Sequence, residues 1–236
     1  MISVVVPAFN EERRLAGTLP QIVAYLESRD EAWEVVVVDD GSDDGTAAIA
    51  GAAGAGVRLV RLPENRGKGA ALRAGVLETR GDRVLLTDAD LSTPMSELEK
   101  LEPHLERADL VFGSRAVAGA EISDPQPVYR QWMGKTFNLM IRMLVVGGVR
   151  DTQCGFKLLR GDVARELFRD LYLQGFAYDV ELLWLARRAG RRVAEVGVVW
   201  NHEEDSRVHM LLDPLRMAVD LFRFRWHHAR HRRRSG

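Results

Sequence analysis

Short runs of consecutive hydrophobic residues, most of them rich in valine and leucine, recur along the first half of the chain and alternate with segments of helical character. The runs predict strands at residues 2–9, 33–40, 57–63, 84–90 and 109–115. Helices are expected between them at 10–28, with Asn10 as a plausible N-cap, and at 47–54 and 70–79. This alternation, with its short connections, predicts a parallel, doubly wound α/β sheet. Because the runs are continuous rather than alternating, helices should cover both faces of the sheet.

The second half of the chain is less regular. Its pattern predicts helices and one further strand, with no repeat and no linker of low complexity. The helices are expected at 128–146, 162–171 and 178–190, and the strand at 192–200. We therefore expect a single domain over residues 1–212, followed by a basic amphipathic tail over 213–236.

Charge and composition narrow the classes of partner. The formal net charge of −1 indicates no nucleic-acid partner for the chain as a whole. The last 22 residues, however, carry seven arginines and three histidines against one acid, a pattern that suits an anionic surface. The longest apolar stretch, around 140–149, contains Arg142 and two glycines and is too short to span a membrane. The single cysteine and the lack of a leader-like N-terminus favour a cytoplasmic location.

Aspartates follow two of the predicted strands: Asp39 and Asp40 the second, Asp88 and Asp90 the fourth. In open α/β sheets, ligands bind beyond the carboxyl ends of the strands, so the four could line one crevice. In an extended segment the spacing of Asp88 and Asp90 would put both side chains on one face. Paired carboxylates without a nearby His or Cys suit Mg²⁺ or Mn²⁺ holding a diphosphate. The alternative is that such acids cap helices or fill Asx turns.

The glycine-rich segment at 65–75 lacks the spacing of a Walker A motif, and no GxGxxG follows the first strand. Gly67 and Gly69 permit tight turns. Lys68 between them could reach a phosphate or pair with an acid.

Six motifs occur in an order and at spacings that resemble those of glycosyltransferase family 2. They are PAFNEE, VVVVDDGSDDGT, NRGKGAAL, TDADLSTP, FGSR and DTQCGFKLL. The set is most similar to the polyprenyl-phosphate sugar synthases, the dolichyl-phosphate glucosyl- and mannosyltransferase group. The resemblance implies a GT-A fold with a mostly parallel central sheet, a nucleotide-sugar donor and a divalent metal, Mg²⁺ or Mn²⁺.

The resemblance also implies roles for individual residues. Asp90 would be the primary metal ligand, with Asp88 beside it, and both would span the ribose and diphosphate together with Ala89. Where mannosyl enzymes often carry Gln two residues after the last Asp, this chain has Ser92, which favours the glucosyl branch. The residues expected around the rest of the nucleotide sugar are Pro7, Phe9, Glu11, Val38, Asp40 and Lys68.

The acceptor implied by the resemblance is a polyprenyl phosphate, whose oxygen is already ionised near neutral pH. We therefore expect in-line attack on the anomeric carbon with inversion and no obligatory general base, in contrast to hydroxyl acceptors. Asp179 and Glu181 are then interpreted as groups of the sugar or metal shell. Arginines should hold the acceptor phosphate: Arg115 is the strongest candidate, followed by Arg130 and Arg207.

Two segments could meet lipid, 214–226 and 128–146, although both could instead pack on the core. Membrane contact would then be peripheral, on the cytoplasmic face or through a membrane partner. Other functions stay open at this point. The same fold could transfer sugar to a saccharide or small-molecule hydroxyl, or bind a nucleotide sugar without turnover. The donor could be UDP-glucose or GDP-mannose.

Overall fold

The computed structural model describes residues 1–122, 148–201 and 212–232. Its strands are β1 Ile2–Ala8, β2 Trp33–Asp39, β3 Val57–Arg61, β4 Arg83–Leu86, β5 Leu110–Ser114, β6 Glu121–Ile122, β7 Lys157–Arg160, β8 Val193–Gly197 and β9 Val199–Trp200. Its α-helices are α1 Glu12–Glu27, α2 Thr46–Ala52, α3 Lys68–Glu78, α4 Leu98–Leu101, α6 Gly161–Asp170, α7 Tyr178–Arg188 and α8 Leu212–Arg232. Short 3₁₀ helices flank α4 at Met95–Glu97 and Glu102–Glu106.

Within the described residues, the main sheet has the strand order β3-β2-β1-β4-β7-β5-β8. The pairs β1–β2, β1–β4, β2–β3 and β5–β8 are parallel, whereas β7 runs antiparallel to both β4 and β5. The predicted, mostly parallel sheet is confirmed. Because β7 runs backwards, its first residue, Lys157, pairs with Leu86 at the carboxyl end of β4 and with Phe112 of β5. The segment leading into β7 therefore lies at the edge where the parallel strands end.

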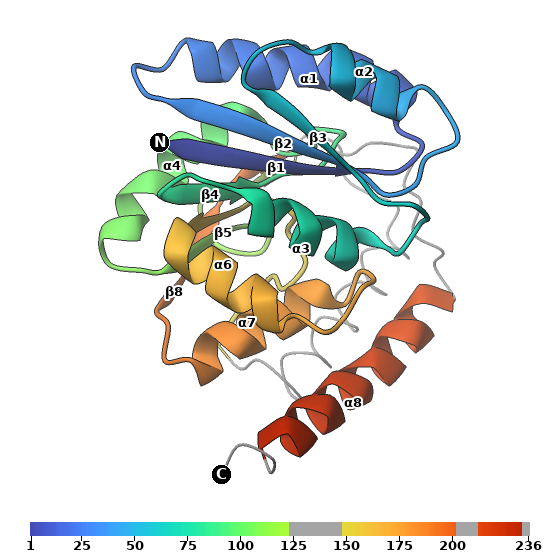
Figure 1. Ribbon diagram of the computed structural model, residues 1–236. Helices are drawn as coiled ribbons and strands as arrows, with labels where there is room; N and C mark the ends of the chain where they lie inside the picture. Colours follow the sequence, from blue (N-terminus) through green and yellow to red (C-terminus); the bar gives the residue numbers. More distant parts are fainter. Residues whose placement is uncertain (123–147, 202–211, 233–236) are drawn as a thin grey trace.

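Helices cover both faces of the sheet, as the continuous hydrophobic runs predicted. Alternate residues of β2 show the division: Val35 and Val37 belong to a core cluster that includes residues of α1, α2 and α4. Val36 and Val38 belong to a second cluster with α3, α6, α7 and α8. Figure 1 shows the pair α1 and α2 on one side of the sheet and the helices α3, α6 and α7 on the other.

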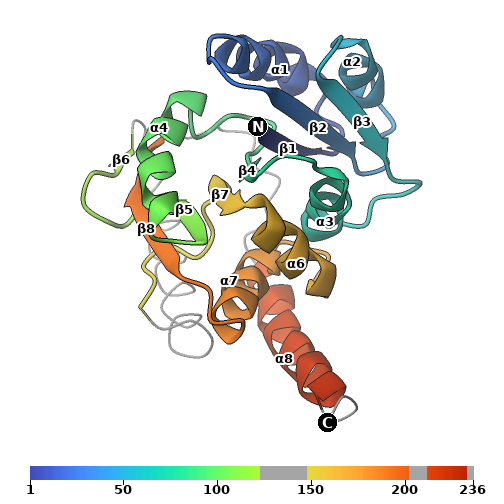
Figure 2. The same ribbon diagram turned by 60° about the vertical axis from the view of Figure 1, so that its left-hand side comes forward.

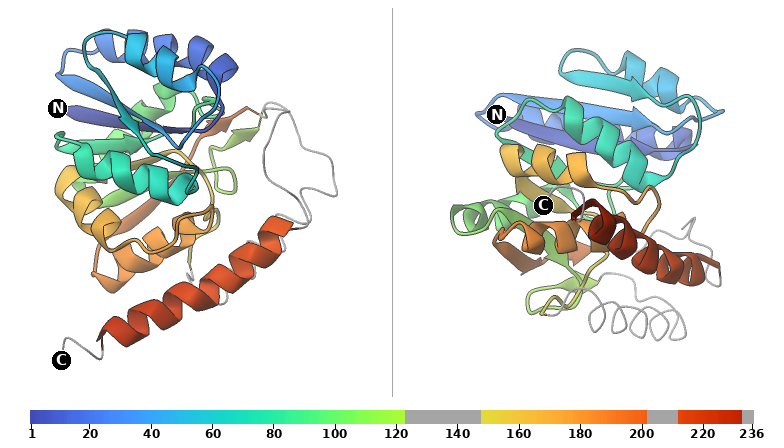
Figure 3. Two further views of the ribbon diagram at one scale, coloured as in Figure 1. Left: turned by 45° about the vertical axis from the view of Figure 1, so that its right-hand side comes forward. Right: turned by 60° about the horizontal axis from the view of Figure 1, so that its bottom comes forward.

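The C-terminal helix α8 includes the segment 214–226, for which lipid contact was considered, extends beyond it at both ends and packs against α7 (Figure 2). Leu221 and Phe224 enter the second core cluster. Figure 3 shows the helix running along the outside of the helical layer, so that one side contacts the domain and the other faces outwards. None of the helices in the described part of the chain combines the length and hydropathy needed to cross a membrane.

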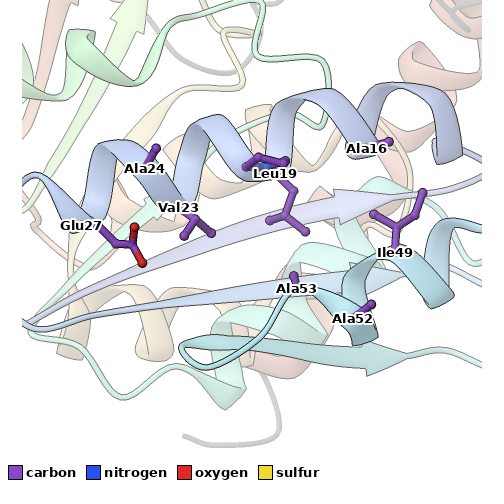
Figure 4. A pocket seen from close by; sticks show the side chains of 9 residues that line it. Ala16, Leu19, Val23, Ala24, Glu27, Ile49, Ala52 and Ala53 are labelled. Atoms are coloured by element: carbon purple, nitrogen blue, oxygen red, sulfur yellow. The ribbon is translucent and has the colours of Figure 1, made fainter.

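A surface groove lies between α1 and α2 (Figure 4). Small and aliphatic side chains line most of it, and Glu27 is its one charged lining residue among those described. The residues that line this groove include no cluster of polar groups, so the groove is a poorer candidate for a catalytic site than the carboxyl edge of the sheet.

Candidate functional site

The two aspartates after β4 lie in a turn, not in an extended strand. β4 ends at Leu86, and the amide of Leu91 donates to the carbonyl of Asp88 at 3.2 Å. The amide of Ser92 donates to Asp90 Oδ1 at 2.9 Å, and Leu91 has a φ of 50°. The expectation that extended spacing aligns Asp88 and Asp90 was therefore wrong. A tight turn orients them, and the left-handed residue at its end is the strain that often accompanies functional loops.

Lys68 and Asp88 form an ion pair, with Nζ 2.5 Å from Oδ1. Burial would lower the pKa of Lys68, but the charges of Asp88 and Asp179 outweigh it and raise that pKa. Burial would likewise raise the pKa of Asp88, but Lys68 first and then Lys157 outweigh it and lower that pKa. Both groups are thus charged at neutral pH, and Lys68 takes the second of its two predicted roles by pairing with an acid.

The segment before β7 and the first residue of that strand supply two residues that sequence reasoning did not single out. Gly155 lies against Asp88, where a Cβ atom would come within 2.2 Å of Oδ2. Lys157, fully buried, donates to Asp179 and to the carbonyl of Cys154. The signal in the sequence was a glycine and a lysine in a short segment that enters a buried strand. Its meaning depends on partners far away in the chain.

Replacing Gly155 with alanine is expected to displace the Asp88 carboxylate and to reduce the glycosyltransferase activity expected from the sequence resemblance, while the protein stays folded. The reason is steric, because an added Cβ would overlap with a side chain that Lys68 already holds in place. The measurement is kcat/KM together with the melting temperature. Gly175→Ala is the matched control, since a Cβ there meets nothing within 4 Å. Equal activity of the two variants would contradict this interpretation of Gly155.

Arg115 directly follows β5 and is held by Asp151, which lies in the segment before β7. Its Nε lies 2.8 Å from Oδ2 and its Nη2 3.0 Å from Oδ1, a bidentate pair, and its amide also donates to Oδ2. Burial would raise the pKa of Asp151, but the guanidinium outweighs it and lowers that pKa. Trp200 contributes a cation–π contact at 5.3 Å. The guanidinium is thus fixed in orientation, as a phosphate-binding group needs to be, with part of its fork committed to Asp151.

Asp179 is almost completely buried and is paired with Lys157. The neighbouring Tyr178 is buried too, with its ring centre 5.6 Å from Lys157 Nζ and 6.0 Å from Lys68 Nζ. Burial first, and the charges of Asp179 and Asp88 second, raise the pKa of Tyr178 well above its ordinary value. The carboxylate of Asp179 is therefore already engaged by Lys157.

Glu181 differs from its predicted role in the sugar or metal shell. Its fully buried carboxylate accepts the backbone amides of Tyr172 and Leu173 and contacts His228. Glu181 therefore holds the backbone of Tyr172 and Leu173 in place.

The first aspartate pair ties β2 to the glycine-rich loop. Asp40 accepts hydrogen bonds from the amides of Arg66 and Gly67 at 2.9 and 2.8 Å. The pKa of Asp40 is raised, and burial is the largest cause. Gly67, with a φ of 100°, needs glycine both for this conformation and for close packing. Asp39 accepts the amide of Ser42 at 3.0 Å. Asp39 thus fills the turn-forming role that the sequence left open as an alternative, whereas Asp40 joins the end of β2 to the loop before α3.

The remaining predicted donor residues lie around the same edge with varied orientations. Pro7 pairs with Val38 in the sheet register, but the Val38 side chain is buried beneath α3, next to Gly75. Ala89 is in the turn, and its carbonyl accepts the hydroxyl of Thr18 at 2.7 Å.

Phe9 and Glu11 connect β1 to α1, and Glu11 pairs with Arg14 at 3.1 Å. Asn10 is not the N-cap as predicted. It has a φ of 50°, the cap position is Glu11, and the Asn10 side chain accepts the amide of Asp43. This contact joins the two loops at the edge of the sheet.

Among the described residues, no group of three or more His, Cys, Asp and Glu side chains gathers as a metal site would. Asp90 and Asp88 nevertheless provide hard oxygen donors, and Mg²⁺ and Mn²⁺ in phosphoryl sites commonly take one or two carboxylates plus substrate oxygens. Since Lys68 already neutralises Asp88, Asp90 fits a metal best. Arg130, Arg207 and the predicted helix at 128–146 lie outside the described residues.

Comparison with known proteins gives consistent matches. The family model described as "Glycosyl transferase family 2" matches residues 3–168. The protein of Trichomonas vaginalis named dolichyl-phosphate beta-glucosyltransferase ALG5C is 40% identical over 232 residues, which are 92% of this chain and 68% of that protein. The dolichyl-phosphate beta-glucosyltransferase of Mus musculus is 38% identical over 237 residues, which are 93% of this chain and 73% of the mouse protein.

Solved structures agree on the fold. The glucosyl-3-phosphoglycerate synthase of Mycobacterium tuberculosis in complex with UDP superposes with a TM-score of 0.65 at 25% identity, over 91% of this chain and 74% of that one. Its complex with Mn²⁺, UDP and glucosyl-3-phosphoglycerate gives a TM-score of 0.66 at 24% identity, over 94% and 77% of the two chains. The expected GT-A fold is confirmed.

Proposed function

Because the chain belongs to glycosyltransferase family 2, we propose that it transfers glucose from a nucleotide donor to dolichyl phosphate or a related polyprenyl phosphate. The observation that carries the acceptor and the sugar is the similarity, at 30–40% identity over more than nine-tenths of the chain, to proteins named dolichyl-phosphate beta-glucosyltransferase. The arrangement of Asp88, Asp90 and Lys68 beyond β4 supports a donor diphosphate at the carboxyl edge.

UDP-glucose is the proposed donor. Solved structures with the same fold contain UDP and Mn²⁺, which supports both the uridine nucleotide and a divalent metal. In this chain Asp90 would hold the metal together with diphosphate oxygens, and Asp88 would keep Lys68 beside the same phosphates. The metal, when bound, would supply charge stabilisation for the departing nucleotide.

The site favours an acceptor that needs no deprotonation. Two described acids of the site are engaged by cations: Asp179 by Lys157, and Asp151 by Arg115. A phosphate acceptor is already ionised and would be oriented by Arg115, so the attacking oxygen could displace the nucleotide directly. Hydroxyl transfer by the same fold would need a free base. A base at Asp179 would be supported instead if Asp179→Asn abolished turnover while nucleotide binding survived.

The acceptor is tested by comparing dolichyl phosphate with dolichol at equal concentration in the same detergent. The proposal predicts glucosyl transfer to the phosphate and none above background to the alcohol. Equal transfer to both would contradict a phosphate acceptor and favour the hydroxyl alternative. Binding of UDP-glucose without transfer to either would favour a nucleotide-sugar-binding protein without turnover.

We propose a peripheral membrane contact through α8, consistent with a cytoplasmic location on the membrane face. Val219, Phe222 and Trp226 recur at i, i+3 and i+7 and are 49%, 73% and 61% exposed. The buried Leu221 and Phe224 occupy the opposite side of the helix. Exposed arginines flank the outer stripe, and Arg230 stacks on Trp226 at 3.6 Å. An apolar stripe with basic neighbours is typical of helices in the membrane interface.

The double variant Phe222→Ser/Trp226→Ser is expected to lose most of its binding to vesicles that contain phosphatidylserine. It should keep its melting temperature, since both side chains are exposed. Sedimentation with vesicles measures the effect, and Tyr172→Phe is a control that leaves the outer stripe of α8 unchanged. Unchanged sedimentation of the double variant would contradict a membrane role for this face.

A further inference from the structure

Helix α8 contacts α7 and the segment between α6 and α7 through two adjacent histidines. The His227 ring stacks on Tyr172, with ring centres 4.0 Å apart and planes 16° apart. His228, largely buried, places Nε2 2.6 Å from Glu181 Oε1. The inner face of α8 therefore makes an aromatic contact with this segment and a polar contact with α7, in addition to the packing of its apolar residues.

Glu181 links His228 to the backbone of the segment between α6 and α7. Its carboxylate is fully buried and accepts the amide of Tyr172 at 3.1 Å and that of Leu173 at 2.7 Å. A buried carboxylate depends on such partners, so the positions of Glu181, His228 and these two amides are linked. Loss of the histidine contact would leave part of the carboxylate unsatisfied and would loosen its hold on the segment.

The same segment packs on the N-terminus of α3. The carbonyl of Gln174 accepts the amide of Ala70 at 3.0 Å. A Cβ on Gly67 would lie 2.7 Å from that carbonyl oxygen, and one on Gly69 would lie 2.6 Å from the carbonyl oxygen of Leu173. The two backbones are thus as close as glycine permits, on both sides of Lys68, whose ammonium reaches Asp88.

We propose that His228 is a positioning residue for the donor site. It holds Glu181, and Glu181 holds the backbone of Tyr172 and Leu173 against the glycines that flank Lys68. Lys68 is thereby kept at Asp88. The inference rests on the proposed binding of a nucleotide diphosphate at that site. It assigns to the C-terminal helix a role in donor affinity that is separate from its outer, lipid-facing side.

The test compares three variants in solution, without lipid. His228→Ala removes the contact, His228→Gln restores an N–H donor toward Glu181, and Phe222→Ala alters only the outer face of α8. Calorimetry gives the Kd for UDP in the presence of Mn²⁺, and hydrogen exchange reports on residues 66–72. His228→Ala should raise the Kd roughly 2- to 30-fold and speed exchange at 66–72. The other two variants should stay close to the wild type.

Unchanged UDP affinity of His228→Ala, or an equal loss in Phe222→Ala, would overturn the inference. So would faster exchange at 66–72 without a change in Kd. If the alanine variant does not fold, His228→Leu fills the space without the hydrogen bond and is judged by the same outcomes. Failure of the wild-type protein to bind UDP with Mn²⁺ would instead contradict the proposed donor, a result that is distinct from the variants' behaviour.

Discussion

Asp90→Asn is expected to reduce glucosyl transfer by roughly 10²- to 10⁴-fold while the protein keeps its fold. The side chain lies in the turn after β4, where Ser92 fixes one of its oxygens, and it is the carboxylate best suited to a divalent metal beside the donor diphosphate. Asparagine keeps the oxygen that accepts this hydrogen bond but removes the charge that the metal requires. The measurement is kcat at saturating donor over a series of Mn²⁺ concentrations.

Asp43→Asn is the matched control, because Asp43 is an exposed aspartate in the turn after β2. It should keep near wild-type activity. Substantial activity of Asp90→Asn at all Mn²⁺ concentrations would contradict the assignment of Asp90 as metal ligand. Loss of the folded state in Asp90→Asn would contradict a purely catalytic role.

Lys157→Met is expected to lower stability by about 3–5 kcal/mol, because it leaves Asp179 buried without its cation. For a chain of this size the melting temperature should fall by roughly 6–20 °C. The double variant Lys157→Met/Asp179→Leu should recover most of that loss, since an apolar pair can replace a buried ion pair at little cost. Denaturant unfolding of the wild type, both single variants and the double variant gives the coupling energy.

A double variant that recovers no stability would contradict a buried pair of charges. If the double variant were as unstable as the sum of the two single variants, Lys157 and Asp179 would not be coupled. Transfer activity is not expected to return in the double variant, because the Asp179 carboxylate also helps to hold the charge of Lys68.

The sequence predicted the edge of the sheet at which the candidate residues gather, because buried parallel strands leave continuous hydrophobic runs whose ends are easy to see. Asp40 and Asp88 were placed at this edge for that reason. What the runs do not show is local backbone geometry. β4 stops at Leu86, so the Asp88–Asp90 spacing was assigned to a strand when it belongs to a turn.

Pairings between distant residues were also beyond the sequence. Lys157 and Asp179 are 22 positions apart, and Arg115 and Asp151 are 36 apart. Their partners become defined only when β7 enters the sheet antiparallel between β4 and β5. Glu181 was misassigned for the same reason: its functional neighbours are backbone amides and a histidine of the last helix. Motif resemblance selected the candidate residues, whereas tertiary contacts determine which partners each of them has.

The central claim is tested most directly by transfer of radiolabelled glucose from UDP-glucose into an organic-extractable dolichyl phosphate, with GDP-mannose as the parallel donor. The account predicts label in the lipid from UDP-glucose only, dependent on Mn²⁺ or Mg²⁺, abolished by EDTA and absent with Asp90→Asn. Label from GDP-mannose alone would contradict the assigned sugar. Absence of lipid label from either donor, with the metal present and the nucleotide bound, would contradict the proposed reaction itself.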